Sequence, residues 1–277
     1  MQTLKPEHSL DILLEIKGMA RTTYYYNVRP KEDKYAQLRK EIVRIFNKHK
    51  GRYGYRRVCL QLCNEGYPVN HKTVAKLMNE MGLQAHRPKK HYHSFKGEVG
   101  KIAPNILERD FATDAPNRKW TTDVSQIEIH GKKCYLSPIL DMWNGEIVSY
   151  VISTRPNWEM VEEMLRKAFR KYPQLNNAIM HSDQGWLYQQ TRFQYLLREH
   201  GLIQSMSRRG NCLDNSIMEN FFGAMKNELL YPNEWDNIET FKEALRQYIR
   251  YYNNERIKLR LKMSPVQYRT HFQNQVN

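Results

Sequence analysis

The sequence is poor in the features that mark secreted and membrane proteins. Only 4 of its 277 residues are cysteines, too few for the disulfide framework of a small secreted domain. No apolar run reaches the roughly 20 residues that a membrane helix needs, and the opening MQTLKPEHSL contains no apolar signal core. These absences predict a cytoplasmic protein in a reducing compartment.

Zinc-binding patterns are also absent. Cys59 and Cys63 lie four residues apart within a helical pattern, but no second Cys or His pair at zinc spacing follows closely. We therefore expect no zinc site.

Acidic residues are scarce in one part of the chain only. The whole chain has a formal charge of +15, and residues 1–100 hold 20 Lys and Arg against 9 Asp and Glu. The other 177 residues are close to balance, with 24 against 20. This asymmetry favours a polyanion-binding module in the N-terminal part. The alternative is an ordinary solvated surface.

Helical spacing dominates the basic part. Residues 34–49 repeat apolar side chains at helical intervals, and residues 50–83 predict two further short helices. Gly66 and Gly82 are natural helix stops, and Asn70 is a candidate N-cap. Two helices joined by a short glycine-containing turn form the helix-turn-helix plan. The alternative is an ordinary packed helical hairpin.

On that plan, several polar side chains of this region contact DNA. We expect the second helix to present His71, Lys72, Lys76 and Asn79 to a groove, while Arg56 and Arg57 approach phosphates. Residues 87–115 lack periodicity and are interpreted as a linker, whose basic cluster includes Lys89 and Lys90. This linker either follows a nucleic-acid backbone or is only a tether.

The pattern changes from helical to strand-like at Trp120. Three segments of strand character precede an amphipathic helix, a short strand at NNAIM, a second helix and a last strand at LIQSMS. The fold class predicted is α/β, with a mixed five-stranded sheet and flanking helices. The expected parts are an N-terminal helical arm (1–33), a helix-turn-helix domain (34–86), the linker (87–115), a catalytic core (116–232) and a C-terminal helical, basic extension (233–277).

Three carboxylates occupy positions where an acid is costly or unexpected. Asp123 lies in the first strand segment, Asp183 ends the fourth, and Glu219 lies on an amphipathic helix. If they converge, three oxygen donors suit Mg²⁺ or Mn²⁺, and two such ions activate an attacking hydroxyl and stabilise a leaving oxygen. Taken singly, each has a simpler explanation as a bulge cap, a turn former or a surface charge.

The spacing of these acids carries a family resemblance. Thirty-five residues separate Asp183 from Glu219, and Lys226 follows Glu219 by two helical turns, so that both share one face. The segments WTTDVSQI, HSDQGWLY, SMSRRGNCLDNSIMENFFGAMKNELLY and YYNNERIKLRLKMSPVQYR resemble the second open reading frame product of insertion-sequence 3 family transposases. These belong to the Asp-Asp-Glu transposases and retroviral integrases. The resemblance covers residues 20–270.

The resemblance implies a ribonuclease-H-like core and a reaction scheme. Asp123, Asp183 and Glu219 would be the catalytic, metal-binding triad, with two Mg²⁺ ions, and Lys226 would contact DNA. Water would cleave a phosphodiester at the end of the element, and the freed 3′-hydroxyl would attack other DNA, in copy-out, paste-in transposition. The implied partners are the terminal inverted repeats, target DNA, a second copy of the chain and the upstream reading-frame product. The implied location is the bacterial nucleoid.

Other residues of these motifs have supporting interpretations. Asn215 either touches DNA or orients Glu219, and Arg208 and Arg209 clamp phosphates or form a plain surface loop. Trp186 and Tyr188 are interpreted as packing residues, with base stacking as the alternative. Asp141 is the rival active-site carboxylate, for which a structural role is favoured. At the C-terminus, we expect Arg256 to Lys262 to face DNA or to form a solvated basic tail.

Three functions remain open at this point. The first is DNA strand cleavage and joining. The second is a non-catalytic DNA-binding repressor of the same element, and the third is a metal-dependent nuclease of the same fold. The three acids argue against the repressor, which has no need for them. A joined DNA product separates the first function from the third.

Overall fold

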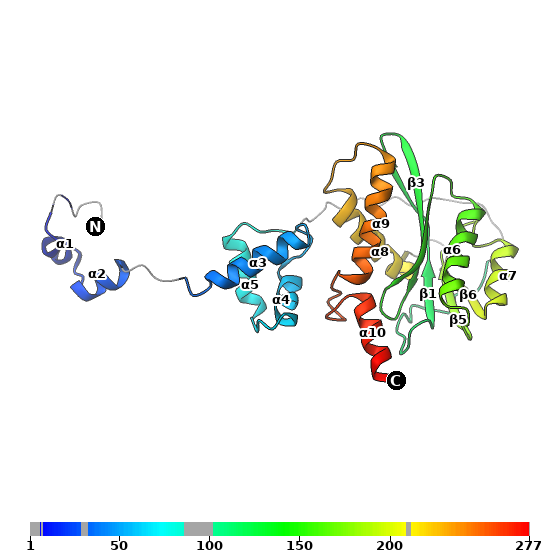
Figure 1. Cartoon of the computed structure of the whole chain (residues 1–277), viewed down its shortest axis with the longest axis horizontal. Coiled ribbons are helices and arrows are strands. Elements are labelled where there is room, and N and C mark those ends of the chain that lie inside the picture. Colours follow the sequence, from blue (N-terminus) through cyan, green and yellow to red (C-terminus); the bar gives the residue numbers. More distant parts are fainter. Residues whose placement is uncertain (1–5, 7, 29–32, 86–101, 209–211, 277) are drawn as a thin grey trace. The chain divides into compact units, whose positions relative to one another are not determined.

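The computed structural model describes residues 6, 8–28, 33–85, 102–208 and 212–276 (Figure 1). Lys89, Lys90 and Arg209 lie outside the described residues. The chain divides into two compact units, residues 1–44 and 45–277. The first unit contains α1 (Leu10–Lys17), α2 (Arg21–Val28) and the beginning of α3 (Ala36–Lys48). None of the described helices has the length and apolar character needed to cross a bilayer.

The second unit begins with the expected helix-turn-helix pair, α4 (Tyr55–Asn64) and α5 (His71–Glu80). Asn70 caps α5, because its side-chain oxygen accepts a hydrogen bond of 2.8 Å from the Lys72 backbone N–H. Gly66 and Gly82 take left-handed φ values of 86° and 68° where the two helices have ended. The two helices, the cap and both stops are therefore confirmed.

A mixed sheet forms the centre of this unit. Its strands are β1 (Lys119–Thr122), β2 (Ser125–Ile129), β3 (Lys132–Asp141), β4 (Ile147–Ser153), β5 (Ala178–Ser182) and β6 (Leu202–Met206). β3 pairs antiparallel with β1, β2 and β4, whereas β5 pairs in parallel with β1 and with β6. The mixed sheet is as expected, but the described residues form six strands instead of five. The first expected strand is interrupted at Asp123 and Val124.

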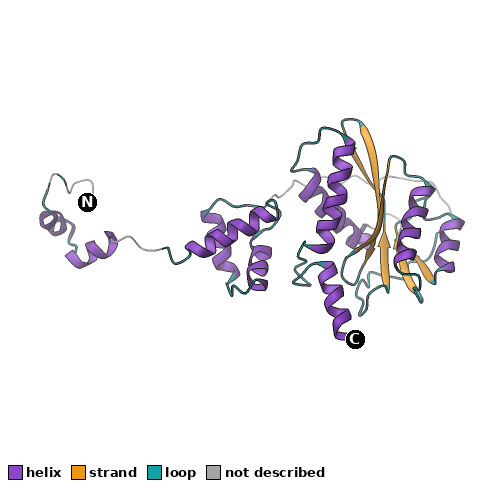
Figure 2. Cartoon of the chain, in the orientation of Figure 1, coloured by secondary structure: helices purple, strands orange, loops and turns teal. Residues whose placement is uncertain are grey.

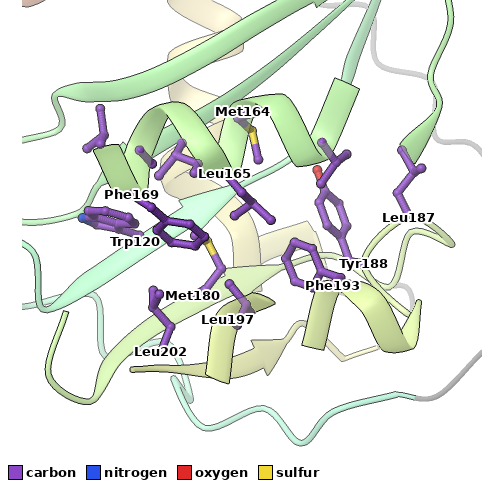
Figure 3. Packing of buried hydrophobic residues seen from close by; sticks show 14 of the residues in the cluster. Trp120, Met164, Leu165, Phe169, Met180, Leu187, Tyr188, Phe193, Leu197 and Leu202 are labelled. Carbon is purple, nitrogen blue, oxygen red and sulfur yellow. The ribbon is translucent and has the colours of Figure 1, made fainter. Parts of the chain in front are cut away.

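Helices cover both faces of the sheet (Figures 1 and 2). α6 (Trp158–Lys171) and α7 (Thr191–Glu199) bury their apolar sides in one cluster, together with Trp120, Met180 and Phe193 (Figure 3). α8 (Ser216–Met225) and α9 (Ile238–Asn254) build a second cluster on the other face around Phe221 and Leu245. Apolar burial on both faces gives the sheet a rigid frame at whose edge functional side chains can be held.

The C-terminal helix α10 (Pro265–Val276) is joined to the sheet by a buried ionic cluster. Arg269 donates 2.7 Å and 2.5 Å hydrogen bonds to Asp141 and Glu146 respectively, and Lys171 lies 2.7 Å from the other oxygen of Glu146. Burial raises the pKa of Asp141, although Arg269 acts to lower it. Asp141, the rival active-site carboxylate, is therefore structural.

Arg269→Met removes the guanidinium that both buried carboxylates share. We expect a loss of about 3–5 kcal/mol in the free energy of unfolding, because two buried acids lose their counter-charge. Urea unfolding at neutral pH measures this loss. The control is Arg246→Met, which breaks an exposed pair with Glu243 and is expected to cost less than about 1 kcal/mol. Equal losses for the two variants would contradict the structural role of Arg269.

Candidate active site

Asp123 lies at the break between β1 and β2. Its Oδ1 accepts a 2.7 Å hydrogen bond from the backbone N–H of Val124. The side chain is partly exposed, and the described residues form no hydrogen bond with its second oxygen, Oδ2. The break in the strand thus places a carboxylate at the sheet edge with one oxygen available to a ligand.

Asp183 directly follows β5, and β5 lies beside β1 in parallel, with Thr121 opposite His181. Both acids therefore leave neighbouring strands at the same end of the sheet. The Oδ1 of Asp183 accepts a 2.9 Å hydrogen bond from the Gly185 backbone N–H. A Cβ at position 185 would lie 2.8 Å from this oxygen, so only glycine fits there without a shift of the carboxylate. Asp183 is thus a turn former whose other oxygen stays available.

Glu219 lies in the first turn of α8. The start of this helix is fixed to the sheet by a hydrogen bond. Thr121 of β1 donates a 2.6 Å hydrogen bond to the side-chain oxygen of Asn215, the residue before α8. Both side chains are buried. Asn215 therefore joins the helix that carries Glu219 to the strand that leads to Asp123, which supports the orienting role over the DNA contact.

The three carboxylates share one electrostatic environment. Burial raises the pKa of Asp123 well above its usual range, and the negative charges of Asp183 and Glu219 raise it further. The backbone N–H of Val124 and the charge of Lys226 act in the opposite direction. Burial also raises the pKa values of Asp183 and Glu219. Negative charge in this place is unfavourable unless a cation accompanies it.

The donor chemistry of this group suits a hard divalent ion, since carboxylate oxygens are the ligands that Mg²⁺ prefers. Within the described part of the chain, no three His, Cys, Asp or Glu side chains form a ready-made metal site. The acids thus influence one another electrostatically without forming a compact ligand cluster. The thiols of Cys59 and Cys63 both lie within hydrogen-bond distance of the carbonyl of Val69.

Lys226 begins a π-helical segment, η2 (Lys226–Leu230), that continues α8. Because α8 is regular up to Met225, Lys226 still shares the face of Glu219. No ion pair within 4.0 Å involves Lys226 among the residues that the structure describes. Its charge lowers the pKa of Asp123. The nearby acid Glu228 pairs with Arg256 at 2.6 Å.

The polar residues beside Asp183 mainly hold the loop. His181 is fully buried between the hydroxyls of Ser205 and Ser207, at 3.0 and 3.1 Å from its two ring nitrogens, and burial lowers its pKa to about 4. Both nitrogens are therefore used within the fold. Gln184 donates a 3.0 Å hydrogen bond to the carbonyl of Ser207.

The two aromatic residues of the same loop differ in exposure. Tyr188 is buried within the apolar cluster (Figure 3). Burial raises the pKa of its hydroxyl well above the usual range, and the negative charges of Asp123 and Asp183 raise it further. Trp186 is 49% exposed, so of the two packing roles expected, in the core or within the loop, the core role is excluded. A ring at the surface beside Asp183 leaves base stacking open.

Asp214 is a buried acid that the sequence analysis missed. Its two oxygens accept hydrogen bonds from Arg208 (2.9 Å from both Nε and Nη2), from Arg109 (2.8 Å) and from Asn105 (3.1 Å). The Arg208 guanidinium holds the pKa of Asp214 well below its usual range. Arg208, expected to clamp DNA phosphates, is thus engaged in fixing the loop before α8. A polar Asp directly before Asn215 is the only sequence signal for this role.

The helix-turn-helix residues divide by exposure. Arg56, His71, Lys72 and Lys76 are exposed, as contact with a polyanion requires. Arg57 instead turns inward, where its Nε donates a 3.0 Å hydrogen bond to the carbonyl of Ile257. Arg256, expected to face DNA, is also buried and paired with Glu228. Both arginines lie beside Glu228, because an acid held in the interior attracts the nearest guanidiniums.

Comparison with known proteins places the chain among mobile-element proteins. Family models match residues 32–91 as an HTH-like domain, and residues 113–212 and 219–272 as integrase core domains. A protein described as transposase InsK for insertion sequence element IS150, from Escherichia coli (strain K12), is 47% identical over 97% of this chain and 96% of its own length. Transposase InsF for insertion sequence IS3A, from the same organism, is 30% identical over 75% of this chain and 73% of its own length.

Among solved structures, the integrase catalytic core domain of HTLV-2, in complex with magnesium, matches with a TM-score of 0.44 and 17% identity. This match covers 55% of the present chain and 95% of the viral one.

The ion pairs of Asp214 generate a pH-dependent prediction. The folded state lowers the pKa of the Asp214 carboxyl below its unfolded value of 3.8. These ion pairs therefore stabilise the fold above pH 3.8, and this stabilisation is lost as the pH falls below that value. Asp214→Asn should therefore cost about 2–3 kcal/mol at pH 7 and progressively less below pH 4. Urea unfolding between pH 7 and pH 3 measures both effects. The control is the exposed Asp114→Asn. A loss for Asp214→Asn that stays constant with pH would contradict the ionic role.

Proposed function

The chain belongs to the insertion-sequence 3 family of DNA transposases, as a product of the second reading frame, and we propose that it cleaves the ends of its element and joins them to other DNA. The observation that carries this proposal is geometric. Asp123 and Asp183 leave neighbouring parallel strands at the same end of the sheet, and the helix that carries Glu219 is joined to β1 through the bond from Thr121 to Asn215. A repressor gains nothing from three acids whose burial is unfavourable. Phosphodiester chemistry with a divalent ion needs such a group.

In this proposal, Asp123, Asp183 and Glu219 hold two Mg²⁺ ions, which Mn²⁺ can replace. The ions supply activation of the attacking hydroxyl and stabilisation of the leaving oxygen. The protein contributes the position of each oxygen. The Val124 and Gly185 N–H groups orient the two aspartates, and the bond from Thr121 to Asn215 fixes the start of the helix that carries Glu219.

Two successive displacements at phosphorus account for the reaction. In the first, a water oxygen bonds to the phosphorus at the end of the element, the 3′-oxygen of the element's terminal nucleotide leaves as a hydroxyl, and the phosphate stays on the flanking DNA. In the second, this 3′-hydroxyl attacks another DNA phosphodiester, whose own 3′-oxygen leaves, so that one P–O bond forms as another breaks. Lys226 binds a backbone phosphate beside the reacting bond. Family resemblance supports copy-out, paste-in as the overall route.

The parts of the chain divide this work. Residues 34–86 recognise the terminal inverted repeats through the exposed Arg56, His71, Lys72 and Lys76, and residues 116–232 carry the chemistry. Residues 1–33, 87–115 and 233–277 act as arm, linker and extension. Pairing of two DNA ends requires at least two copies of the chain, and the upstream reading-frame product is a further partner.

Asp123→Asn, Asp183→Asn and Glu219→Gln test the chemistry separately from binding. Each should reduce cleavage and joining of a labelled end-bearing duplex in Mg²⁺ on the order of 1,000-fold, equivalent to about 4 kcal/mol of barrier. Asparagine keeps the oxygen that accepts the Val124 or Gly185 N–H. We therefore expect unchanged DNA affinity and, without divalent ions, equal or higher thermal stability, because a buried charge is removed.

Lys72→Gln with Lys76→Gln is the matched control for binding. This variant should bind the duplex more weakly, with a salt dependence reduced by about 0.9 in slope for each lost phosphate contact. Wild-type activity in any of the three acidic variants would refute the catalytic assignment. Cleavage without a joined product would favour the nuclease, and binding without cleavage would favour the repressor.

Lys226→Ala tests the phosphate contact beside the acids. Because a hydrogen bond to a charged group contributes about 1.5–3 kcal/mol, cleavage and joining should fall about 10- to 100-fold. Lys226→Arg should recover part of this loss, since its charge is retained. Gel assays of both steps, with melting curves with and without Mg²⁺, separate this effect from loss of the metal site. Full activity of Lys226→Ala would identify Lys226 as a solvated charge.

A further inference from the structure

A second group of charged side chains lies where α4 meets the π-helical end of the catalytic helix. Glu228 of η2 accepts two hydrogen bonds from Arg256, of 2.6 Å to Oε1 and 2.7 Å to Oε2, and a third of 3.1 Å from the hydroxyl of Tyr248. Burial acts to raise the pKa of Glu228, but Arg256 lowers it below its usual range. Arg256 therefore satisfies this carboxylate.

Two further guanidiniums lie beside Glu228, and neither forms a hydrogen bond with its carboxylate among the described residues. The Nη1 of Arg57 lies 3.7 Å from Glu228 Oε1, beyond hydrogen-bond distance. Arg52 donates a 3.1 Å hydrogen bond to the backbone carbonyl of Glu228, and its guanidinium lies over the rings of Tyr248 and Tyr251. Three positive groups and one negative group thus lie around one cavity. Burial lowers the pKa of Arg57 and the charge of Arg256 lowers it further, which indicates uncompensated positive charge.

A cavity of about 240 Å³ opens beside these groups. Its walls include three arginines, Arg52, Arg57 and Arg256, and one carboxylate, that of Glu228. Gly54 and Ala224 leave space between them, and Asn227 adds an amide. One water molecule occupies about 30 Å³ of liquid, so a phosphate group fits with room to spare. Guanidinium N–H groups match the oxygens of a phosphate in geometry as well as in charge.

We propose that this cavity binds one backbone phosphate of the transposon-end DNA. The inference rests on the proposed function, because DNA is taken as the source of the phosphate. The excess positive charge of the cavity is then neutralised by the substrate. Asn227 directly follows Lys226, and Arg57 lies on α4, the helix before the recognition helix. One phosphate held here connects the DNA-recognition region to the helix that carries Glu219.

Two variants test the cavity in complementary ways. Arg57→Gln removes a charge that no carboxylate of the described residues hydrogen-bonds. It should weaken binding of an end-bearing duplex about tenfold, with the salt slope reduced by about 0.9. Ala224→Glu places a carboxylate where the phosphate would lie. It should weaken binding to a similar extent while leaving the folded chain equally or more stable, because it supplies the missing counter-charge.

Arg170→Gln is the matched control, since it changes the net charge by the same amount at an exposed position of α6. It should leave the affinity and the salt slope close to those of the wild type. Methylphosphonate substitution, scanned along the wild-type duplex, should reveal a phosphate whose neutralisation weakens binding. The same substitution should have little further effect on Ala224→Glu, which distinguishes this contact from those of α5.

Inorganic phosphate, followed by melting temperature, separates DNA from free phosphate as the source. Stabilisation of the wild type but not of Ala224→Glu supports an anion site. Loss of DNA binding in both cavity variants, together with the scan, assigns that site to DNA. Cavity variants that bind duplex with wild-type affinity and salt slope overturn the inference, while strand joining by the wild type upholds the proposed function. Failure of the wild type to cleave or join would instead count against the proposed function.

Discussion

β1 and β5 pair in parallel, with Thr121 opposite His181, and the candidate site is arranged around this contact. Parallel neighbours end at the same edge of a sheet, so Asp123 and Asp183 emerge side by side although 59 residues separate them along the chain. The apolar clusters on both faces hold the two strands in register. The hydroxyl of Thr121 also donates a hydrogen bond to Asn215 at the start of α8, so the helix that carries Glu219 is joined to the same pair of strands. A shift of one residue between β1 and β5 would turn both carboxylates away from each other.

The site acids differ from the other buried acids of the described chain in their counter-charges. Asp141 and Glu146 share Arg269, Asp214 binds Arg208 and Arg109, and Glu228 binds Arg256. These carboxylates stabilise the fold because an arginine accompanies each of them. Asp123, Asp183 and Glu219 form no such pair among the described residues, and Lys226 acts on Asp123 only at longer range. An uncompensated group of this kind is expected where substrate and ions supply the missing positive charge.

At the end of the helix that carries Glu219, two residues that are only two positions apart point in different directions. Lys226 stays on the face of Glu219, whereas Glu228 points to Arg256 and the helix-turn-helix side of the unit. The π-helical turn makes the two directions compatible, because it changes the angular position of the residues that follow Lys226. The positive cavity beside Glu228 and the negative site beside Glu219 therefore both adjoin the continuous helix formed by α8 and η2. Their opposite charges suit a substrate whose phosphates bind to one and react at the other.

The sequence by itself determined the local structure and the chemical type of the site. Helical and alternating periodicity, with Asn70, Gly66 and Gly82 as boundaries, is enough to predict the helix-turn-helix and the mixed sheet, because these signals act between near neighbours. Asp123, Asp183, Glu219 and Lys226 are singled out by their order and spacing within motifs that resemble the family, since each of them taken alone also has a simpler explanation. Tertiary structure alone decided the break of the first strand at Asp123, the exposure of Trp186, and the partners of Arg57, Arg208 and Arg256. Whether an arginine binds DNA or a buried acid depends on which distant residues fold beside it, and side-chain chemistry alone does not contain that information.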